Sequence, residues 1–348
     1  MPIRSRLVFC LAALPLAGCS TLGYYAHLAG GETALLAARR PIARVVADPA
    51  TSPTLKTRLE LAARARAFAS DTLRLPRNRS YTSYADLHRD YAVWNVFAAA
   101  EFSLDAHRHC FPIAGCVAYR GYYDKARAER YAAELRTRGL ETYVGGVSAF
   151  STLGFFADPI LNTMLRWDDD ELAGTIFHEL AHQRVYLKGD TEFNESFASF
   201  VQREGLRQWR ATRGLAPADE VAAAHDEAFE ALVLAARGRL AALYAEPLPA
   251  EEMRTRKAQE FARLRADYAQ LRDTQWHGDK SYDGWFAGDL NNAKLLPFGL
   301  YRRWTAAFAA LYAQNGGDWE RFFVAVERLK QATPAERGAQ LETLQAPP

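Results

Sequence analysis

The most informative pattern in the chain is His178-Glu179-x-x-His182, which lies in the stretch Thr175–Gln183. A helix turns by about 100° per residue, so His178 and His182 would lie about 40° apart in projection, one turn above the other. Both imidazoles could then bind one metal ion, with Glu179 close to it but not between them. A carboxylate in that position can take a proton from a metal-activated water, which is the chemistry of a zinc hydrolase.

Catalytic zinc usually has three protein ligands and one open position, so two histidines need a third partner. Glu195 supplies it, thirteen residues after His182, on a second helix predicted over residues 193–209. The face of that helix that carries Glu195 also carries two small residues and an amide, namely Ala198, Ser199 and Gln202. Small residues would let the two helices approach closely. Glu192 is the alternative ligand, but the sequence places it in the turn between the helices.

A structural helix with exposed histidines is the competing interpretation, because such a motif arises by chance in roughly one chain of this length in a hundred. Three features favour the metal site. The acidic run at residues 168–171 suits the N-terminus of a helix dipole. The downstream glutamate lies on a face with small residues. The flanks of the motif are apolar, with Phe177, Leu180 and Ala181 on the opposite side of the turn.

The N-terminus predicts a targeting segment over residues 1–18, with a basic start followed by a short apolar run at residues 7–16. The run is too short to span a bilayer, and no later run is apolar enough to do so. The segment closes with Leu16-Ala17-Gly18-Cys19, which resembles the lipobox of bacterial lipoproteins. That resemblance implies cleavage before Cys19 and lipid on its thiol. Ser20 in place of aspartate favours the outer membrane. The alternative is an ordinary secretory signal with an incidental cysteine.

The mature chain is expected to be electrically neutral. The whole sequence has 43 basic and 41 acidic residues, and the signal segment removes Arg4 and Arg6. No basic stripe with interleaved aromatic residues is present, so nothing in the sequence indicates a nucleic-acid partner. About 330 mature residues can bury a large core, and we expect one domain over residues 19–348.

Two cysteines remain after Cys10 leaves with the signal and Cys19 is assigned to the lipid. Cys110 and Cys116 are separated by five residues, and in an oxidising periplasm this pair predicts a small loop disulfide. Two free thiols or a second metal site are the alternatives. A second metal site lacks further ligands at a matching spacing.

The chain predicts an α+β fold that is mainly α, with a small mixed sheet before the metal-binding helix. A helical N-terminal part covers residues 20–80, sheet and metal helices cover 81–210, and a helical part covers 211–348. Strands are expected in the segments rich in β-branched and aromatic residues, at 91–97, 117–122 and 141–147. Helices are expected at 20–38 with a break at Gly30-Gly31, at 53–74, at 123–138, at 217–246, at 249–273 and through much of 291–345.

The segment Val147–Gly154 is expected to be the strand nearest the cleft. A peptide could pair with its backbone as an added strand. A purely structural edge strand is the alternative. The long helices at 217–246 and 249–273 would form an antiparallel hairpin with solvated charged faces.

The region from His178 to Glu195 resembles the gluzincin metallopeptidases, because Asn194-Glu195-Ser-Phe-Ala198 is similar to their Asn-Glu-x-x-Ala element. The gap between His182 and Glu195 is shorter than in the best-known members. More closely, the chain resembles a family of bacterial lipoproteins labelled "putative aminopeptidases". The shared pieces are Cys110–Cys116, Ser151–Gly154, Phe177–Gln183, Gly189-Asp190, Phe193–Ala198 and Asn291-Asn292-Ala293. The resemblance implies a zincin-like fold and one zinc ion per chain.

The mechanism expected from these residues is zinc-assisted peptide hydrolysis. His178, His182 and Glu195 would hold the ion, while Glu179 would take the proton from water and return it to the leaving amine. A tyrosine or histidine of the C-terminal part should stabilise the oxyanion. The candidates are Tyr282, Tyr301 and His277.

Two residues at the start of the second helix are candidates for supporting roles. Asp190 would either orient a ligand histidine or cap that helix, and Asn194 precedes the glutamate ligand.

The choice between exo- and endopeptidase depends on recognition of a free α-ammonium group, which calls for an extra carboxylate in the cleft. The candidates for it are Glu101, Glu192 and Asp158. The family resemblance predicts cleavage of short peptides from a free N-terminus, and an endopeptidase is the alternative. A zinc-containing scaffold or chaperone that binds a partner through residues 217–273 is a further alternative, but a scaffold would not need Glu179.

Overall fold

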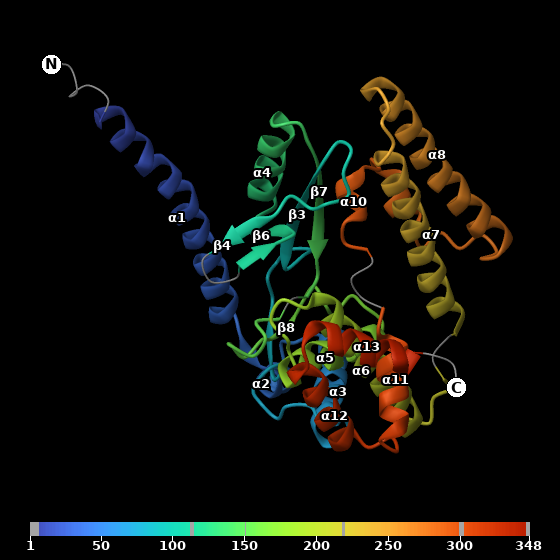
Figure 1. Cartoon of the computed structure of the whole chain (residues 1–348). Helices are drawn as coiled ribbons and strands as arrows, with labels where there is room; N and C mark the ends of the chain where they lie inside the picture. Colours follow the sequence, from blue (N-terminus) through green and yellow to red (C-terminus); the bar gives the residue numbers. More distant parts are fainter. Residues whose placement is uncertain (1–6, 112–114, 150, 218–219, 299–302, 346–348) are drawn as a thin grey trace.

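The computed structural model describes residues 7–345, apart from 112–114, 150, 218–219 and 299–302, with side chains of the first helix described from Leu22 onward (Figure 1). The described chain is mainly helical with small sheets, as expected for a mainly α member of the α+β class. No described helix is long and apolar enough to cross a membrane.

The largest core lies in the lower part of Figure 1, where helices from both halves of the chain pack around the metal-motif helix. Its helices are α2 (Ile42–Ala47), α3 (Pro53–Asp71), α5 (Asp169–Arg184), α6 (Thr191–Thr212), α11 (Thr305–Gln314), α12 (Trp319–Gln331) and α13 (Pro334–Gln345). A small mixed sheet borders them, with β1 (Arg40–Pro41) antiparallel and β8 (Ile160–Leu161) parallel to β2 (Ser83–Ala85). Aromatic contacts join the elements, for example Phe197 with Phe308 and Phe322.

A second layer, above this core in Figure 1, is an antiparallel sheet in the order β6-β3-β7. Its strands are β6 (Tyr119–Tyr122), β3 (Val93–Ala100) and β7 (Leu140–Val147), and α4 (Lys125–Thr137) covers one face. Alternation along β3 buries Trp94, Val96 and Ala98 beneath α4 and leaves Val93, Asn95 and Phe97 half-buried on the opposite face. The helix expected at residues 123–138 is confirmed.

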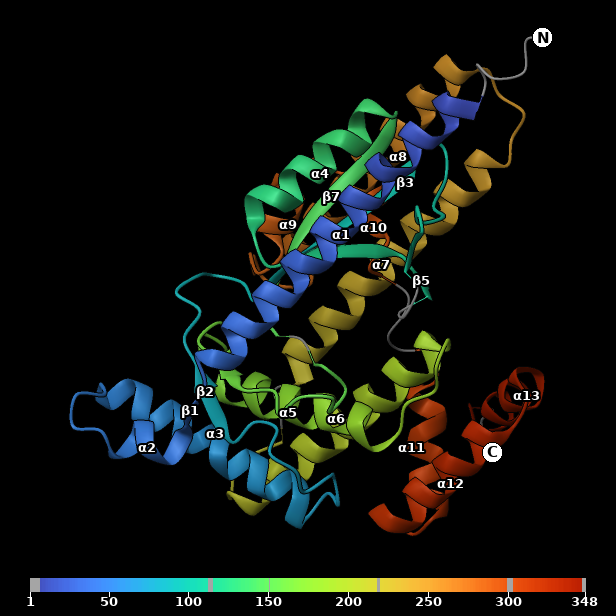
Figure 2. The ribbon, with the colours of Figure 1, turned by 90° about the vertical axis from the view of Figure 1, so that its left-hand side faces the viewer.

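The N-terminal helix α1 (Leu7–Ala37) is continuous, so the break expected at Gly30-Gly31 is wrong. A Cβ at Gly31 would lie 2.1 Å from the Tyr123 ring, so this glycine permits close packing of the helix rather than a break. Tyr24 is buried and donates a hydrogen bond to the Gly121 carbonyl at 3.0 Å. The helix therefore packs firmly on the sheet layer (Figure 2).

The expected helical hairpin is confirmed as α7 (Glu220–Tyr244) and α8 (Ala250–Thr274). The sequence predicted that the charged faces of this hairpin would be solvated, but one side of it is buried. Aromatic and aliphatic side chains of the hairpin pack with α9 (Asp283–Ala287) and α10 (Asn292–Leu295) into a separate core. Phe229 stacks on Tyr282 with ring centroids 4.1 Å apart.

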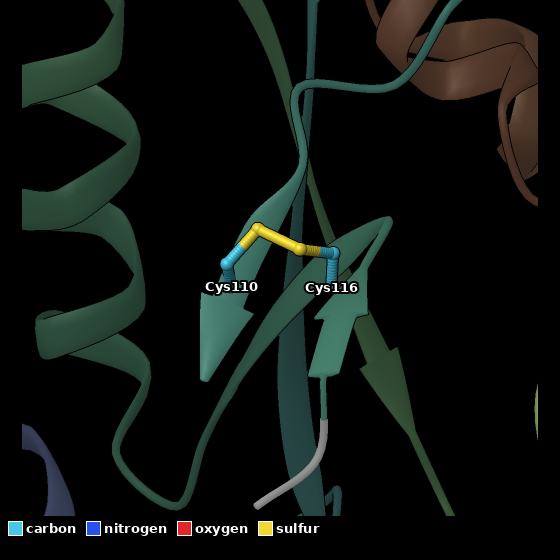
Figure 3. The surroundings of a disulfide bond; sticks show 2 residues. All are labelled: Cys110 and Cys116. Atoms are coloured by element: carbon cyan, nitrogen blue, oxygen red, sulfur yellow. A yellow bond between two sulfur atoms is a disulfide. The ribbon is translucent and has the colours of Figure 1, made fainter. Parts of the chain in front are cut away.

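The two remaining cysteines are joined, as expected. Cys110 and Cys116 lie directly opposite each other in the two-stranded sheet of β4 (His109–Phe111) and β5 (Gly115–Val117), and a disulfide links them (Figure 3). The disulfide cross-links the two strands of the hairpin that precedes β6. The sequence predicted a single strand over residues 117–122, whereas the structure has two strands there, β5 ending at Val117 and β6 beginning at Tyr119.

The expected strand at residues 147–154 is wrong beyond its first residue, because β7 ends at Val147. The following described residues form a loop that closes on Asp158, whose carboxylate accepts hydrogen bonds from the Thr152 backbone at 3.1 Å and hydroxyl at 2.8 Å. Leu153 and Gly154 have φ of 55° and 83°, which is incompatible with a strand. Local side-chain hydrogen bonds thus replace a ladder here.

Candidate metal centre

Close packing of α5 on α6 brings the motif and the downstream glutamate together. A Cβ added to Gly174 would lie 2.9 Å from the Leu206 side chain, and one added to Gly205 would lie 3.0 Å from the Phe177 ring. A larger residue at either position would force a neighbouring side chain to move, so the two glycines favour the close crossing of the helices. Asp168 caps α5 and Asp190 caps α6, each by accepting a backbone N–H of the first turn.

Three side chains converge on one point between these helices. The two Nε2 atoms of His178 and His182 lie 3.1 Å apart. The Glu195 carboxylate lies 3.3 Å from His178 Nε2 and 3.6 Å from His182 Nε2. His182 is buried, and His178 and Glu195 are mostly so. Among the described residues, these form the one group of three or more histidine, cysteine, aspartate or glutamate side chains suited to a metal ion.

The geometry fits zinc. Histidine and carboxylate ligands about 2 Å from a tetrahedral ion lie about 3.3 Å from one another, and the three ligand separations in the structure, 3.1, 3.3 and 3.6 Å, fall around that value. Two imidazole nitrogens and one carboxylate oxygen form a donor set typical of catalytic zinc, with a fourth position left for water or substrate. The group formed by His178, His182 and Glu195 could therefore bind a metal ion.

The pKa values of Glu195 and His178 also favour binding of a cation. Burial disfavours the charged forms of Glu195 and His178, but the hydrogen bond between the two side chains and the nearby charges together favour those forms more strongly. The pKa of Glu195 is lowered to about 2, because the carboxylate accepts hydrogen bonds from His178 and His182. The pKa of His178 is raised by its hydrogen bond to Glu195 and by the charge of Glu179. A site that stabilises a proton between these groups also attracts a cation.

Surrounding residues fix the ligands in place. Gln202, about two turns beyond Glu195 on the same face of α6, lies with Oε1 3.1 Å from His178 Nδ1. An amide oxygen there holds the ring with Nε2 directed at the metal position. The sequence placed Gln202 on the correct face but gave it no role. His182 Nδ1 is buried, and no described group hydrogen-bonds to it.

Asn194 and Asp190 serve the loop and the helix end rather than the ligands. The Asn194 side chain bonds to both the N–H and the carbonyl of Leu187 at 2.8 Å, which ties the loop between the helices to α6. Asp190 accepts the Phe193 N–H at 3.0 Å and pairs with buried Arg337 at 2.8 Å. Of the two roles considered for Asp190, the structure shows the cap. Helix α5 ends at Arg184, and Gly189, with φ of 87°, lies five residues later in the loop between the helices.

Glu179 is half-buried on α5, directly after the first histidine. No described residue forms a hydrogen bond or an ion pair with its carboxylate. Its charge nevertheless acts on three neighbours, because it raises the pKa of His178, Tyr81 and Tyr119. An unbonded carboxylate beside the ligands is free to accept a hydrogen bond from a water molecule.

Two tyrosines that the sequence did not single out border the site. Tyr119, on β6, keeps 43% of its surface exposed, yet desolvation raises its pKa, and the charges of Glu195 and Glu179 raise it further. Tyr186 follows α5 and lies with its ring 6.4 Å from that of His182. The strand pattern predicts that Tyr119 alternates with Arg120, but not that it lies near the charges of Glu179 and Glu195, sixty or more residues away in sequence.

The candidates for the oxyanion role lie elsewhere or outside the described residues. The Tyr282 hydroxyl donates to Asp226 of α7, within the separate core of the hairpin. His277 is exposed in the loop after α8. Tyr301 lies outside the described residues.

The acids considered for an α-ammonium group are already bonded. Glu101 pairs with Arg254 at 2.7 Å, and Glu192 pairs with Arg303 at 3.2 Å. Asp158 is buried in the loop after β7, and burial raises its pKa even though Thr152 and Ser151 hydrogen-bond to the carboxylate. The structure therefore brings the three proposed ligands together, but it gives these acids other partners.

A family model described as "Putative aminopeptidase" matches residues 23–341. The chain belongs to this family. The match begins just after the predicted lipid-bearing cysteine and contains every described residue of the metal centre. Neither a curated protein nor a solved structure matches the chain. The family description suggests a peptide hydrolase.

Proposed function

We propose that this protein is a zinc-dependent peptide hydrolase with a gluzincin-type ligand set on a zincin-like arrangement of helices. The convergence of His178, His182 and Glu195 beside the unbonded carboxylate of Glu179 carries the proposal. When bound, zinc supplies Lewis-acid chemistry, in which it polarises the scissile carbonyl and lowers the pKa of water to about 7.

The protein residues then have distinct tasks. Glu179 takes the proton of the attacking water and delivers it to the leaving nitrogen, because its carboxylate has no other described partner. Gln202 keeps His178 in the correct ring orientation. Tyr119, on β6, lies near enough to the site for the charges of Glu195 and Glu179 to raise its pKa, and we assign its phenol the role of hydrogen-bond donor to the oxyanion. Burial and the nearby carboxylates raise the pKa of Tyr119 above the ordinary tyrosine value, so the phenol keeps its proton in neutral and mildly alkaline solution alike.

Tyr119→Phe is expected to lower kcat by about 10²-fold or more with little change in KM, because one oxyanion donor is lost. The ring contact with Phe97, at 5.4 Å between centroids, survives the change, so the fold should be unaffected. Steady-state kinetics on a chromogenic peptide measures the effect. Tyr143→Phe, on the far side of Phe97, is the matched control and should retain activity. Equal kcat for the Tyr119 variant and the wild type would remove Tyr119 from the mechanism.

We propose that the enzyme is an aminopeptidase, in line with the family description. Short peptides with a free N-terminus should lose their first residue, whereas the same peptides with an acetylated N-terminus should be cleaved at least about tenfold more slowly. Mass spectrometry of the products distinguishes the two outcomes. Equal cleavage of both peptides at internal bonds would show an endopeptidase and leave the zinc hydrolase intact.

We further propose that the protein acts in the bacterial envelope, anchored on the periplasmic side, with the outer membrane favoured, through lipid on Cys19, whose side chain lies outside those described. Cys19→Ser should abolish labelling by a fatty-acid analogue and leave the unprocessed precursor. Cys10→Ser is the control, because that cysteine lies within the predicted signal segment. Normal processing and release of the Cys19 variant would instead indicate an ordinary secreted protein.

A further inference from the structure

A second candidate binding site lies at the outer strand of the β6-β3-β7 sheet. In this order, β7 has a partner strand on one side only. The Thr142 carbonyl accepts a hydrogen bond from the Asn291 side chain at 3.2 Å, so the backbone groups of Thr142 point away from β3. Because direction alternates along a strand, the N–H and C=O of Val144 also point away, and no described residue bonds to them. This backbone is open to an added strand.

A hollow of about 750 Å³ lies beside this open edge, between β7 and the segment that enters α10. We call it the β7 groove. The residues that line it include Arg136, Thr142, Tyr143, Val144, Asn291 and Lys294. This volume falls in the range of about 300–1,000 Å³ that is usual for ligand-binding clefts.

Lys294 is the unusual residue of the β7 groove. It is only 6% exposed, and its ammonium group donates a hydrogen bond to the Trp285 carbonyl. Nζ lies 4.8 Å from the Trp285 ring centroid and 5.8 Å from that of Tyr143. No described carboxylate forms an ion pair with it, so a buried cation with three donors has one hydrogen bond. Burial accordingly lowers its pKa. A buried ammonium group that no described carboxylate contacts is a site for an anion.

The other charges of the β7 groove are consistent with an anionic ligand. Arg136 reaches the strand from the α4 side and donates to the Thr142 hydroxyl at 2.7 Å. Glu141 is already bonded to Lys257 and to the Asn292 N–H. Asp289 is exposed, and its charge is offset by Arg265 close to Lys294. Cations therefore flank the open edge on both faces.

We propose that the β7 groove binds an extended peptide that pairs with β7 at Val144 and places a carboxylate on Lys294. Strand addition gives affinity through the backbone, and the buried ammonium selects peptides with a carboxylate at the matching position. This site is separate from the metal centre and does not depend on hydrolysis. The carboxylate could be the C-terminus of the peptide or an acidic side chain.

Fluorescence anisotropy with the zinc-loaded Glu179→Gln protein tests the proposal without turnover. The probes are N-terminally labelled valine–threonine hexapeptides that end in a free carboxylate, in an amide, or in an amide preceded by aspartate. The free carboxylate or the aspartate peptide should bind at least about tenfold more tightly than the neutral amide, and whichever does so identifies the carboxylate source. Equal binding of all three probes, or no binding, would overturn the proposal.

Variants separate this groove from the metal site. Lys294→Met should abolish the preference for a carboxylate. Val144→Pro should weaken all three probes, because it removes only the outward N–H and leaves the ladder to β3 intact. Arg136→Ala should weaken the acidic probes about threefold, whereas Arg138→Ala, which lies at the end of the same helix and outside the groove, should not.

Binding should also survive Glu195→Ala and chelation of zinc, and its loss in either case would place the peptide at the metal centre instead. If Lys294→Met fails to fold by circular dichroism, Val144→Pro and Arg136→Ala decide the result.

Discussion

Glu179→Gln should retain zinc and lose catalysis, with kcat lowered by about 10²- to 10⁴-fold. The amide has the size and shape of the carboxylate but cannot accept the proton of the attacking water. Because no described residue bonds to Glu179, the change should leave packing and the three ligands undisturbed. Metal content by mass spectrometry and kcat on a short peptide should therefore change independently.

Glu192→Gln is the matched control for that experiment. Glu192 is an acid of α6 that pairs with Arg303 at the surface, and it was the alternative third ligand in the sequence. Its replacement should leave both zinc content and kcat unchanged. Full turnover by Glu179→Gln would exclude the proposed base, whereas loss of zinc in Glu192→Gln would exclude the proposed ligand set.

Glu195→Ala should weaken zinc binding by more than about 100-fold, because one of three ligands is lost. Two histidines four residues apart on α5 then remain, without the carboxylate that balances the charge of the ion. Gln202→Ala should have a smaller effect, about 10- to 100-fold, because it removes a group that only orients His178. Competition with a chromogenic chelator measures both affinities.

Glu204→Ala is the control on the same helix, since its carboxylate pairs with Arg207 and lies outside the metal group. It should bind zinc as the wild type does. Wild-type affinity in Glu195→Ala would mean that another residue completes the site. The order of affinities, with Gln202→Ala between the wild type and Glu195→Ala, would support the distinction between ligand and orienting residue.

Local spacing determined much of what the sequence revealed. His178, Glu179 and His182 lie within one turn of a helix, and their relative positions follow from helix geometry alone. The acidic run at the start of α5 and the face of α6 with small residues likewise depend on neighbours in the chain. The paired cysteines lie six positions apart, so their joining in a hairpin also belongs to this local class.

Only the tertiary structure decided which distant groups meet the metal centre. Tyr119 comes from the sheet, and the charges of Glu195 and Glu179 reach it across the boundary between two layers. Arg254 and Arg303 neutralise acids that looked available in the sequence. Such contacts depend on how the layers pack and on which side chains pair with each charge. Neither can be read from the spacing of residues in the sequence.

Contacts between distant residues also explain the two segments whose structure the sequence predicted wrongly. Gly31 looked like a helix break, but the nearby Tyr123 ring makes it a packing glycine within a continuous helix. The segment after Val147 looked like a strand, but Asp158 captures its backbone into a loop. The sequence determined the chemistry held within single turns, and the fold determined the contacts between residues far apart, because those depend on side chains that meet only after the chain has folded.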